Sequence, residues 1–134
     1  MTTVPELVPA SHADLLALPA TATLTTLDRS GRPASTAVWY LLDSDGELKS
    51  SVTTDRQKYR NLRADPRCSL LVIDPANSFR TLEVRADAEL TGDPDLAVVG
   101  RFAAAYGVDP AIFAGQDRCT ITYRPVRVVV NPAG

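Results

Sequence analysis

Basic side chains are concentrated in residues 56–67, although the 134-residue chain carries a formal net charge of −2. The five cations are Arg56, Lys58, Arg60, Arg63 and Arg67. On a helix, Arg56 and Arg60 would stand four residues apart, as would Arg63 and Arg67, and like charges at this spacing repel each other. A cluster that repels itself indicates an anionic partner.

The start of this cluster has the features of a phosphate-binding site. Thr53 and Thr54 end an expected strand, and a helix is expected directly after them, so free backbone N–H groups and a partial positive charge would gather there. Arg56 and Lys58 lie in the first turn and can reach an anion, whereas the later arginines are expected to face water. A solvated helix face remains the alternative. Nucleic acid is disfavoured, because it needs several aromatic platforms and only Tyr59 is present.

Composition excludes several other classes of function. Apolar residues make up 45% of the chain, which suits one packed domain over residues 1–134. No apolar run approaches the roughly 20 residues of a membrane span, and no signal-peptide pattern is present, so we expect a cytoplasmic protein without a membrane partner. Cys68 and Cys119 form no CxxC pair and His12 is the single histidine, so no metal site is expected.

The pattern of apolar and turn residues predicts a mainly β fold with short helices. Six strands are expected, at residues 22–28, 34–43, 48–54, 68–74, 80–90 and 119–131, with a tight turn at Asp45-Gly46. Helices are expected at residues 11–18, at 56–65, at 109–115, and from an Asp93 cap with Pro94 as the first helical residue to Gly107. Many short antiparallel strands favour a small barrel with helices at its rim.

Residues 15–132 resemble the pyridoxamine-phosphate-oxidase-like split β-barrel superfamily. The most specific segment is R-x-K-x-R-N-L-R-x-D-P-R at residues 56–67, which follows AVWYLLD and a hairpin and precedes an apolar strand. The segments FRTLEVRADAELTGDPD, AVVGRFAAAYG and RCTITYRPVRVVV then occur in the family's order. Within the superfamily, the pattern is most similar to the actinobacterial flavin/deazaflavin oxidoreductases of group B, which use coenzyme F420.

The resemblance assigns cofactor-binding roles to the residues around the basic cluster. Lys58 matches the family's lysine for the cofactor phosphate, and Arg56 matches a second phosphate contact. Thr53 and Thr54 match the strand end that donates to the same phosphate. The resemblance therefore gives the cluster one ligand, a phosphate-bearing cofactor.

The resemblance also assigns a strand that lies along the ring system of the cofactor. This strand contains Thr36, Ala37, Val38 and Trp39. For Trp39 a core role remains the alternative, and Tyr40, which alternates with it, is expected to point into the core. Phe79 stands where relatives carry an aromatic side chain that covers the deazaflavin from the partner subunit.

The resemblance implies a six-stranded antiparallel split β-barrel that forms a homodimer, with the cofactor at the subunit interface. Strand 34–42 carries no charge, whereas the pyridoxamine-phosphate oxidases have an arginine there, so pyridoxine chemistry is disfavoured and a deazaflavin is favoured over FMN. The implied activity is hydride transfer from reduced coenzyme F420 to a small unsaturated or carbonyl-type acceptor. An FMN-dependent enzyme of the same fold and a non-catalytic binder of flavin, haem or another tetrapyrrole remain alternatives. No catalytic residue is assigned.

Overall fold

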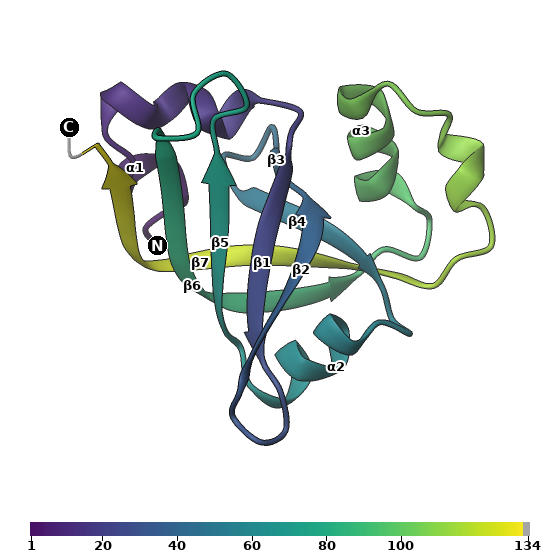
Figure 1. The fold of residues 1–134 in the computed structure, drawn as a ribbon. Coiled ribbons are helices and arrows are strands. Elements are labelled where there is room, and N and C mark those ends of the chain that lie inside the picture. The colour runs from purple at the N-terminus through teal and green to yellow at the C-terminus, as the bar shows by residue number, and fades with distance from the viewer. Residues whose placement is uncertain (133–134) are drawn as a thin grey trace.

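The computed structural model describes residues 1–132, whose strands form one sheet (Figure 1). The strands are β1 (Thr21–Leu27), β2 (Pro33–Trp39), β3 (Leu41–Leu42), β4 (Leu48–Thr53), β5 (Arg67–Ile73), β6 (Thr81–Gly92) and β7 (Arg118–Asn131). The helices are α1 (Val4–Leu7), α2 (Gln57–Ala64) and α3 (Ala97–Tyr106), with the 3₁₀ helices η1 (Ala10–Ala17) and η2 (Pro110–Phe113). No helix among residues 1–132 is long and apolar enough to cross a membrane.

The sheet is curled into a barrel, so that strands far apart in the strand order come together. Neighbouring strands follow the order β2-β1-β5-β6-β7-β4-β3, and each pair is antiparallel. The long strands β6 and β7 shift register between Arg85 and Ala86, where Pro125 lies opposite Ala86, and such an irregularity bends a strand. The curl brings β2 beside β4, where Ser50 Oγ donates a hydrogen bond of 2.7 Å to the carbonyl of Trp39. Strands β2 and β4 are joined here by a side-chain hydrogen bond and are not paired through backbone hydrogen bonds, so the barrel remains split.

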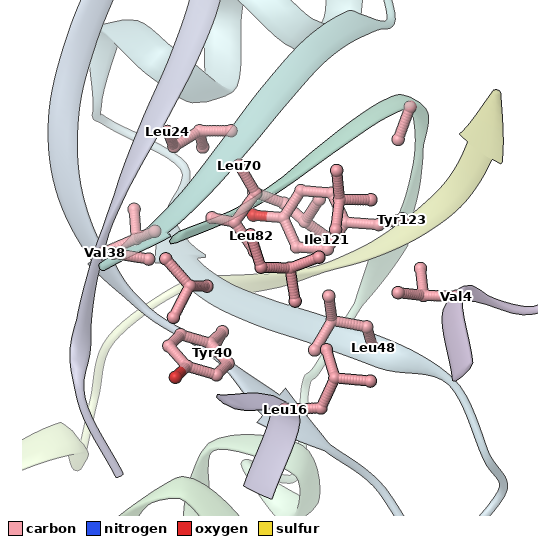
Figure 2. Packing of buried hydrophobic residues seen from close by; sticks show 14 of the residues in the cluster. Val4, Leu16, Leu24, Val38, Tyr40, Leu48, Leu70, Leu82, Ile121 and Tyr123 are labelled. Atoms are coloured by element: carbon pink, nitrogen blue, oxygen red, sulfur yellow. The ribbon is translucent and has the colours of Figure 1, made fainter. Parts of the chain in front are cut away.

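One face of each strand contributes to a common apolar core (Figure 2). Buried side chains from strands across the sheet include Leu24, Val38, Leu48, Leu70, Leu82 and Ile121. Tyr40 and Tyr123 are fully buried as well, and their hydroxyls donate to the carbonyl of Leu15 at 2.7 Å and to Ser50 Oγ at 2.8 Å. These bonds satisfy the polar end of each ring. The burial of Tyr40 confirms that it points away from the side of β2 that carries Trp39.

The sheet has seven strands rather than the expected six. The expected strand 34–43 breaks at Tyr40, between β2 and β3. The hydroxyl of Tyr106 on α3 accepts from the backbone N–H of Tyr40 at 3.1 Å and lies 2.7 Å from its carbonyl. A side chain therefore satisfies the backbone groups that a strand partner would otherwise bind. The sequence pattern of the strand itself carries no trace of this distant tyrosine.

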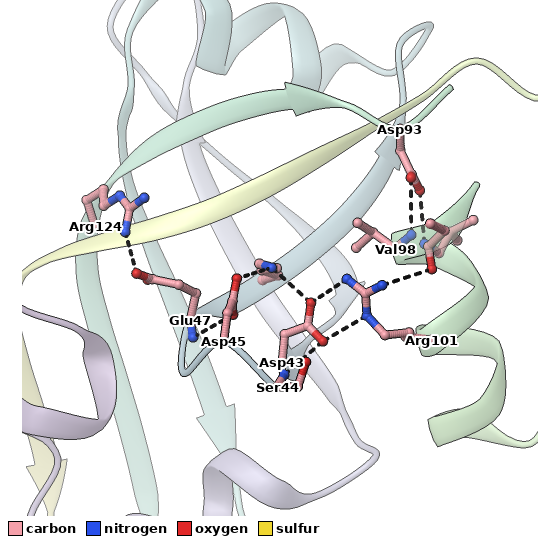
Figure 3. A network of polar contacts seen from close by, with 11 residues as sticks. Asp43, Ser44, Asp45, Glu47, Asp93, Val98, Arg101 and Arg124 are labelled. Carbon is pink, nitrogen blue, oxygen red and sulfur yellow. Dashed lines mark hydrogen bonds and ion pairs between the residues drawn. The ribbon is translucent and has the colours of Figure 1, made fainter. Parts of the chain in front are cut away.

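Helix α3 begins at Ala97, later than the expected start at Pro94. Asp93 nevertheless satisfies the first N–H groups of the helix, because its carboxylate accepts from Val98 at 3.1 Å and from Val99 at 3.0 Å (Figure 3). The prediction was therefore right about the capping side chain and wrong about the residue where the helix starts. Elsewhere the expected elements occur, although η1 and η2 are both of the 3₁₀ type, and the short helix α1 is an addition that the sequence pattern did not predict.

Polar contacts fasten α3 to the barrel. Arg101 donates from Nε and Nη2 to the two carboxylate oxygens of Asp43, at 2.8 and 2.7 Å (Figure 3). The Asp43 side chain is 3% exposed and also pairs with Lys49 at 2.9 Å. The apolar side of α3 packs in a cluster of its own with η2, separate from the barrel core, through Val99, Ala103 and Phe113. In Figure 1, α3 and η2 accordingly stand beside the barrel rather than over its core.

Candidate functional site

A cavity of about 440 Å³ lies between the barrel, the start of α2, and the α3–η2 segment. Strand β2 contributes Ala37, Val38 and Trp39 to its lining, and β4 contributes residues 51–53. Helices α3 and η2 supply the apolar side chains of Val99, Phe102 and Phe113. This volume is within the range of about 300–1,000 Å³ that is usual for small-molecule sites. The cavity is therefore the candidate functional site.

Trp39 connects the apolar wall of the cavity to α3. Its ring stacks on the ring of Tyr106, with the centroids 4.3 Å apart and 10° between the planes. The indole is half-buried and packs against the apolar cluster of α3, while it also lines the cavity. Trp39 therefore packs against α3 and lines the cavity at the same time, while its contact with a ligand stays a prediction.

The opposite part of the lining is cationic. Arg56, Lys58 and Arg118 line the cavity, and none of its lining residues is acidic. Among residues 1–132, none of these three cations forms an ion pair with a carboxylate. Unpaired cations that line one cavity favour the binding of an anion there, since an anion offsets their mutual repulsion.

Lys58 links the start of α2 to the free edge of β2. Its Nζ donates to Thr36 Oγ1 and to the carbonyl of Ala37, both at 3.3 Å. These acceptors are neutral and leave the ammonium charge uncompensated. Burial, followed by the positive charges of Arg56 and Arg118, lowers the pKa of Lys58. An anion beside Lys58 would favour its charged form and so raise the pKa again.

Arg118 is a site residue that the sequence analysis missed. It is the first residue of β7 and lies opposite Thr53 of β4 in the sheet. Its guanidinium carbon lies 4.9 Å from the centre of the Phe113 ring, which is a cation–π distance. Burial lowers the pKa of Arg118, an effect that Asp93 opposes and Arg56 reinforces. Only the register of β4 and β7 brings it to Thr53, so no local sequence signal could have found it.

The structure brings together most of the residues that were expected to bind a cofactor. Those that line the cavity are Ala37, Val38, Trp39, Thr53, Arg56 and Lys58, while Thr36 touches the site through Lys58. Thr54 lies just outside, where its hydroxyl donates to the Asp117 carboxylate at 2.9 Å and lines an adjoining hollow. Phe79 is 80% exposed in the turn between β5 and β6 and does not line the cavity of its own chain. Its role across a subunit interface stays a prediction.

The remaining three cations of the basic cluster face water, as expected. Arg60 donates to the backbone carbonyl of Asp55 at 2.9 Å, and Arg67 forms an ion pair with Asp65 at 2.7 Å. Arg63 lies against the ring of Tyr59. The cluster is thus divided in space: its first two cations belong to the cavity and the last three to the surface.

The split β-barrel and the cationic cavity beside its open edge indicate a small-molecule-binding protein of the split-barrel class. Residues 8–128 match the model of the pyridoxamine 5'-phosphate oxidase family, and the chain belongs to this family. This membership confirms the resemblance deduced from the sequence. A comparison with curated proteins found no significant match.

Solved structures extend the comparison. An F420 reductase is 35% identical to this chain, with a TM-score of 0.79 over 91% of this chain and 98% of its own. A conserved hypothetical protein from Mycobacterium tuberculosis is 26% identical, with a TM-score of 0.76 over 98% and 89% of the two chains. A heme binding protein from Mycobacterium smegmatis is 25% identical, with a TM-score of 0.70 over 92% of this chain and 55% of its own. These similarities confirm the fold.

Proposed function

We propose that this protein is an oxidoreductase that uses coenzyme F420 to reduce a small unsaturated or carbonyl-type acceptor. The observation that carries the proposal is the composition of the cavity, which combines three cations with an uncharged strand and aromatic side chains. A phosphate attached to a flat ring system has the matching chemistry. Family membership and the similarity to an F420 reductase support the same choice.

The residues of the cavity fit such a cofactor. Lys58 and Arg56 would bind its phosphate, and Thr53, whose hydroxyl donates to Asp55 at 2.6 Å, stands at the same end. Ala37 is small and Trp39 is flat, so β2 can accommodate a ring system beside its backbone. When bound, the reduced deazaflavin supplies a hydride, which no protein side chain can provide. The protein would orient the cofactor and enclose it in a partly apolar cavity.

We further propose that the functional unit is a homodimer with the cofactor at the subunit interface. Several large apolar side chains are exposed on the surface of the single chain, including Ile73, Phe79 and Val126, which are 43%, 80% and 69% exposed. A second subunit would cover such side chains and remove their apolar surface from water. In such a dimer, Phe79 of the partner subunit would cover the ring system.

A tetrapyrrole is the second candidate ligand, because one of the similar structures is a heme binding protein. The single histidine of the chain argues against an axial haem ligand. His12 is 2% exposed, and its ring lies 2.8 Å from Ser11 Oγ and 3.0 Å from the carbonyl of Asn131. Both ring nitrogens therefore have structural partners. FMN remains the third candidate, since its ribityl phosphate would also suit Lys58.

Calorimetry with the cofactor-free protein tests the proposal. We expect coenzyme F420 to bind at least ten times more tightly than FMN, a difference of about 1.4 kcal/mol. A deazaflavin without the acidic tail should lose part of this advantage. Tighter or equal binding of FMN would replace the deazaflavin proposal with the FMN alternative. Protein from a host without the deazaflavin should be colourless, because a yellow colour indicates FMN and a Soret band indicates haem.

A further inference from the structure

Arg118 differs from the other two cations of the cavity in its origin and its partners. Arg56 and Lys58 come from the start of α2, whereas Arg118 comes from β7. Its Nε donates to Ser51 Oγ at 3.0 Å, its Nη2 to the carbonyl of Ser51 at 3.2 Å, and its Nη1 to Gln116 Oε1 at 2.6 Å. An arginine has five N–H groups, so these bonds leave one on each terminal nitrogen. All three acceptors are neutral.

The positive charge of the cavity exceeds what one phosphate neutralises. A phosphate group carries a negative charge of at most about 2 at pH 7, whereas three cations line the cavity. The mutual influence of these cations is visible in Lys58, whose pKa both Arg56 and Arg118 lower. With a phosphate held by Arg56 and Lys58, the charge of Arg118 would remain without a counterion.

No carboxylate near Arg118 serves as its counterion among residues 1–132. Asp93 influences the pKa of Arg118, but its two oxygens accept the backbone N–H groups of Val98 and Val99. Arg101 of α3 offers a contrast, because a buried carboxylate, Asp43, compensates it. A half-buried guanidinium without a counterion is costly in the free protein, and a second anion in the cavity would remove that cost.

We propose that Arg118 forms a second anion subsite, which binds a carboxylate beside the phosphate subsite of Arg56 and Lys58. The free N–H groups on its two terminal nitrogens suit the two oxygens of a carboxylate. The ring of Phe113 under the guanidinium offers an apolar surface to the carbon skeleton of the same ligand. This inference rests on the proposed function. The carboxylate belongs either to the hydride acceptor, which is then an organic acid, or to the acidic tail of the deazaflavin.

Three simple probes test the subsite without any cofactor: benzoate, benzamide and inorganic phosphate. The emission of Trp39, the one tryptophan of the chain, reports on ligands in the cavity that it lines. Benzoate should bind at least about tenfold more tightly than benzamide, because a charged hydrogen bond is lost with the amide. Arg118→Gln should weaken benzoate about tenfold and phosphate less than about twofold, and Lys58→Gln should show the reverse preference.

Matched variants keep the test decisive. Arg63→Gln removes an exposed arginine that does not line the cavity and should change neither affinity. Arg118→Lys keeps the charge and loses the fork, so it should weaken benzoate less than Arg118→Gln, and it replaces that variant if circular dichroism shows a folding defect. Equal losses of phosphate affinity in Arg118→Gln and Lys58→Gln, with no preference for benzoate over benzamide, would overturn the second subsite.

Two further titrations identify the source of the carboxylate. A benzoate site that persists in protein saturated with coenzyme F420 assigns the subsite to the acceptor. A loss in Arg118→Gln that is confined to the deazaflavin with its acidic tail, and absent for the tail-free form, assigns the subsite to the cofactor. If the protein distinguishes benzoate from benzamide but does not bind coenzyme F420, the proposed function fails and the subsite stands.

Discussion

Replacement of Lys58 by alanine is the most direct test of the phosphate end of the cavity. Lys58 is the cavity cation whose side chain connects α2 to β2. The substitution removes one ammonium group and its contacts with Thr36 and Ala37, while the apolar wall of the cavity lies elsewhere. We therefore expect a loss of cofactor affinity with little change in the fold.

The magnitude follows from the partners that Lys58 has in the free protein. A charged hydrogen bond to phosphate contributes about 1.5–3 kcal/mol, which corresponds to roughly 10- to 100-fold in affinity. Binding must first replace two hydrogen bonds of 3.3 Å from the ammonium to the neutral acceptors Thr36 Oγ1 and the carbonyl of Ala37. Because these two long bonds already offset part of the gain from the phosphate, we expect a loss near the lower end, about tenfold.

Fluorescence titration measures this loss through Trp39, with Arg63→Ala as the control outside the cavity. Affinity should also fall with added salt, because the site is open to solvent. Equal losses in Lys58→Ala and Arg63→Ala would refute a localised phosphate site and favour a diffuse electrostatic surface. The same titration on Lys58→Arg provides a charge-preserving comparison.

The pH dependence gives an independent check on Lys58. Burial and two neighbouring cations lower its pKa, so the ammonium form is lost at a lower pH than in an ordinary lysine. Affinity for the phosphate is present below this lowered pKa and falls as the pH rises through it. Lys58→Arg should retain affinity to higher pH, because a guanidinium stays protonated. Parallel pH profiles for the two proteins would contradict this role of Lys58.

Three other predictions concern the frame of the site. Tyr106→Phe keeps the stacked ring but leaves the backbone N–H and carbonyl of Tyr40 without the Tyr106 hydroxyl. Thermal unfolding should therefore show a free energy of unfolding that is lower by about 1–3 kcal/mol. Asp43→Asn leaves Arg101 without its carboxylate partner and removes one of the two carboxylates that pair with Lys49, so it should lower the free energy of unfolding by about 3 kcal/mol near pH 7. Arg101 foremost holds the pKa of Asp43 below its usual range, so this difference should shrink only as the pH falls below about 4; a constant difference down to pH 2 would contradict it. Sedimentation at micromolar concentration should give one species near twice 14.4 kDa, and a stable monomer that binds the cofactor would refute the dimer.

The phosphate end of the cavity could be predicted because its residues are neighbours in the sequence. A strand end followed by a helix start places Thr53, Arg56 and Lys58 together by local geometry alone. Asn61 lies in the same motif but serves the frame of the site, because its buried amide donates to Thr26 Oγ1 of β1 at 3.0 Å.

The other walls of the cavity depend on contacts between distant segments. Arg118 reaches the site through the pairing of β7 with β4, and α3 reaches it through the ion pair of Arg101 with Asp43, 58 residues away in the sequence. The break at Tyr40 depends on Tyr106, 66 residues away. Periodicity reports which residues share a face of one element, and it carries no information about which elements meet.

The separation of the α3–η2 cluster from the barrel core affects how such a protein can diversify. The barrel holds most of the buried apolar side chains, whereas the segment from Asp93 to Asp117 has a small cluster of its own. We therefore expect substitutions in that segment to alter the cavity wall while the barrel stays folded. A graft of this segment from a relative should transfer acceptor preference as a unit, provided that the arginine facing Asp43 and the tyrosine beneath Trp39 are kept.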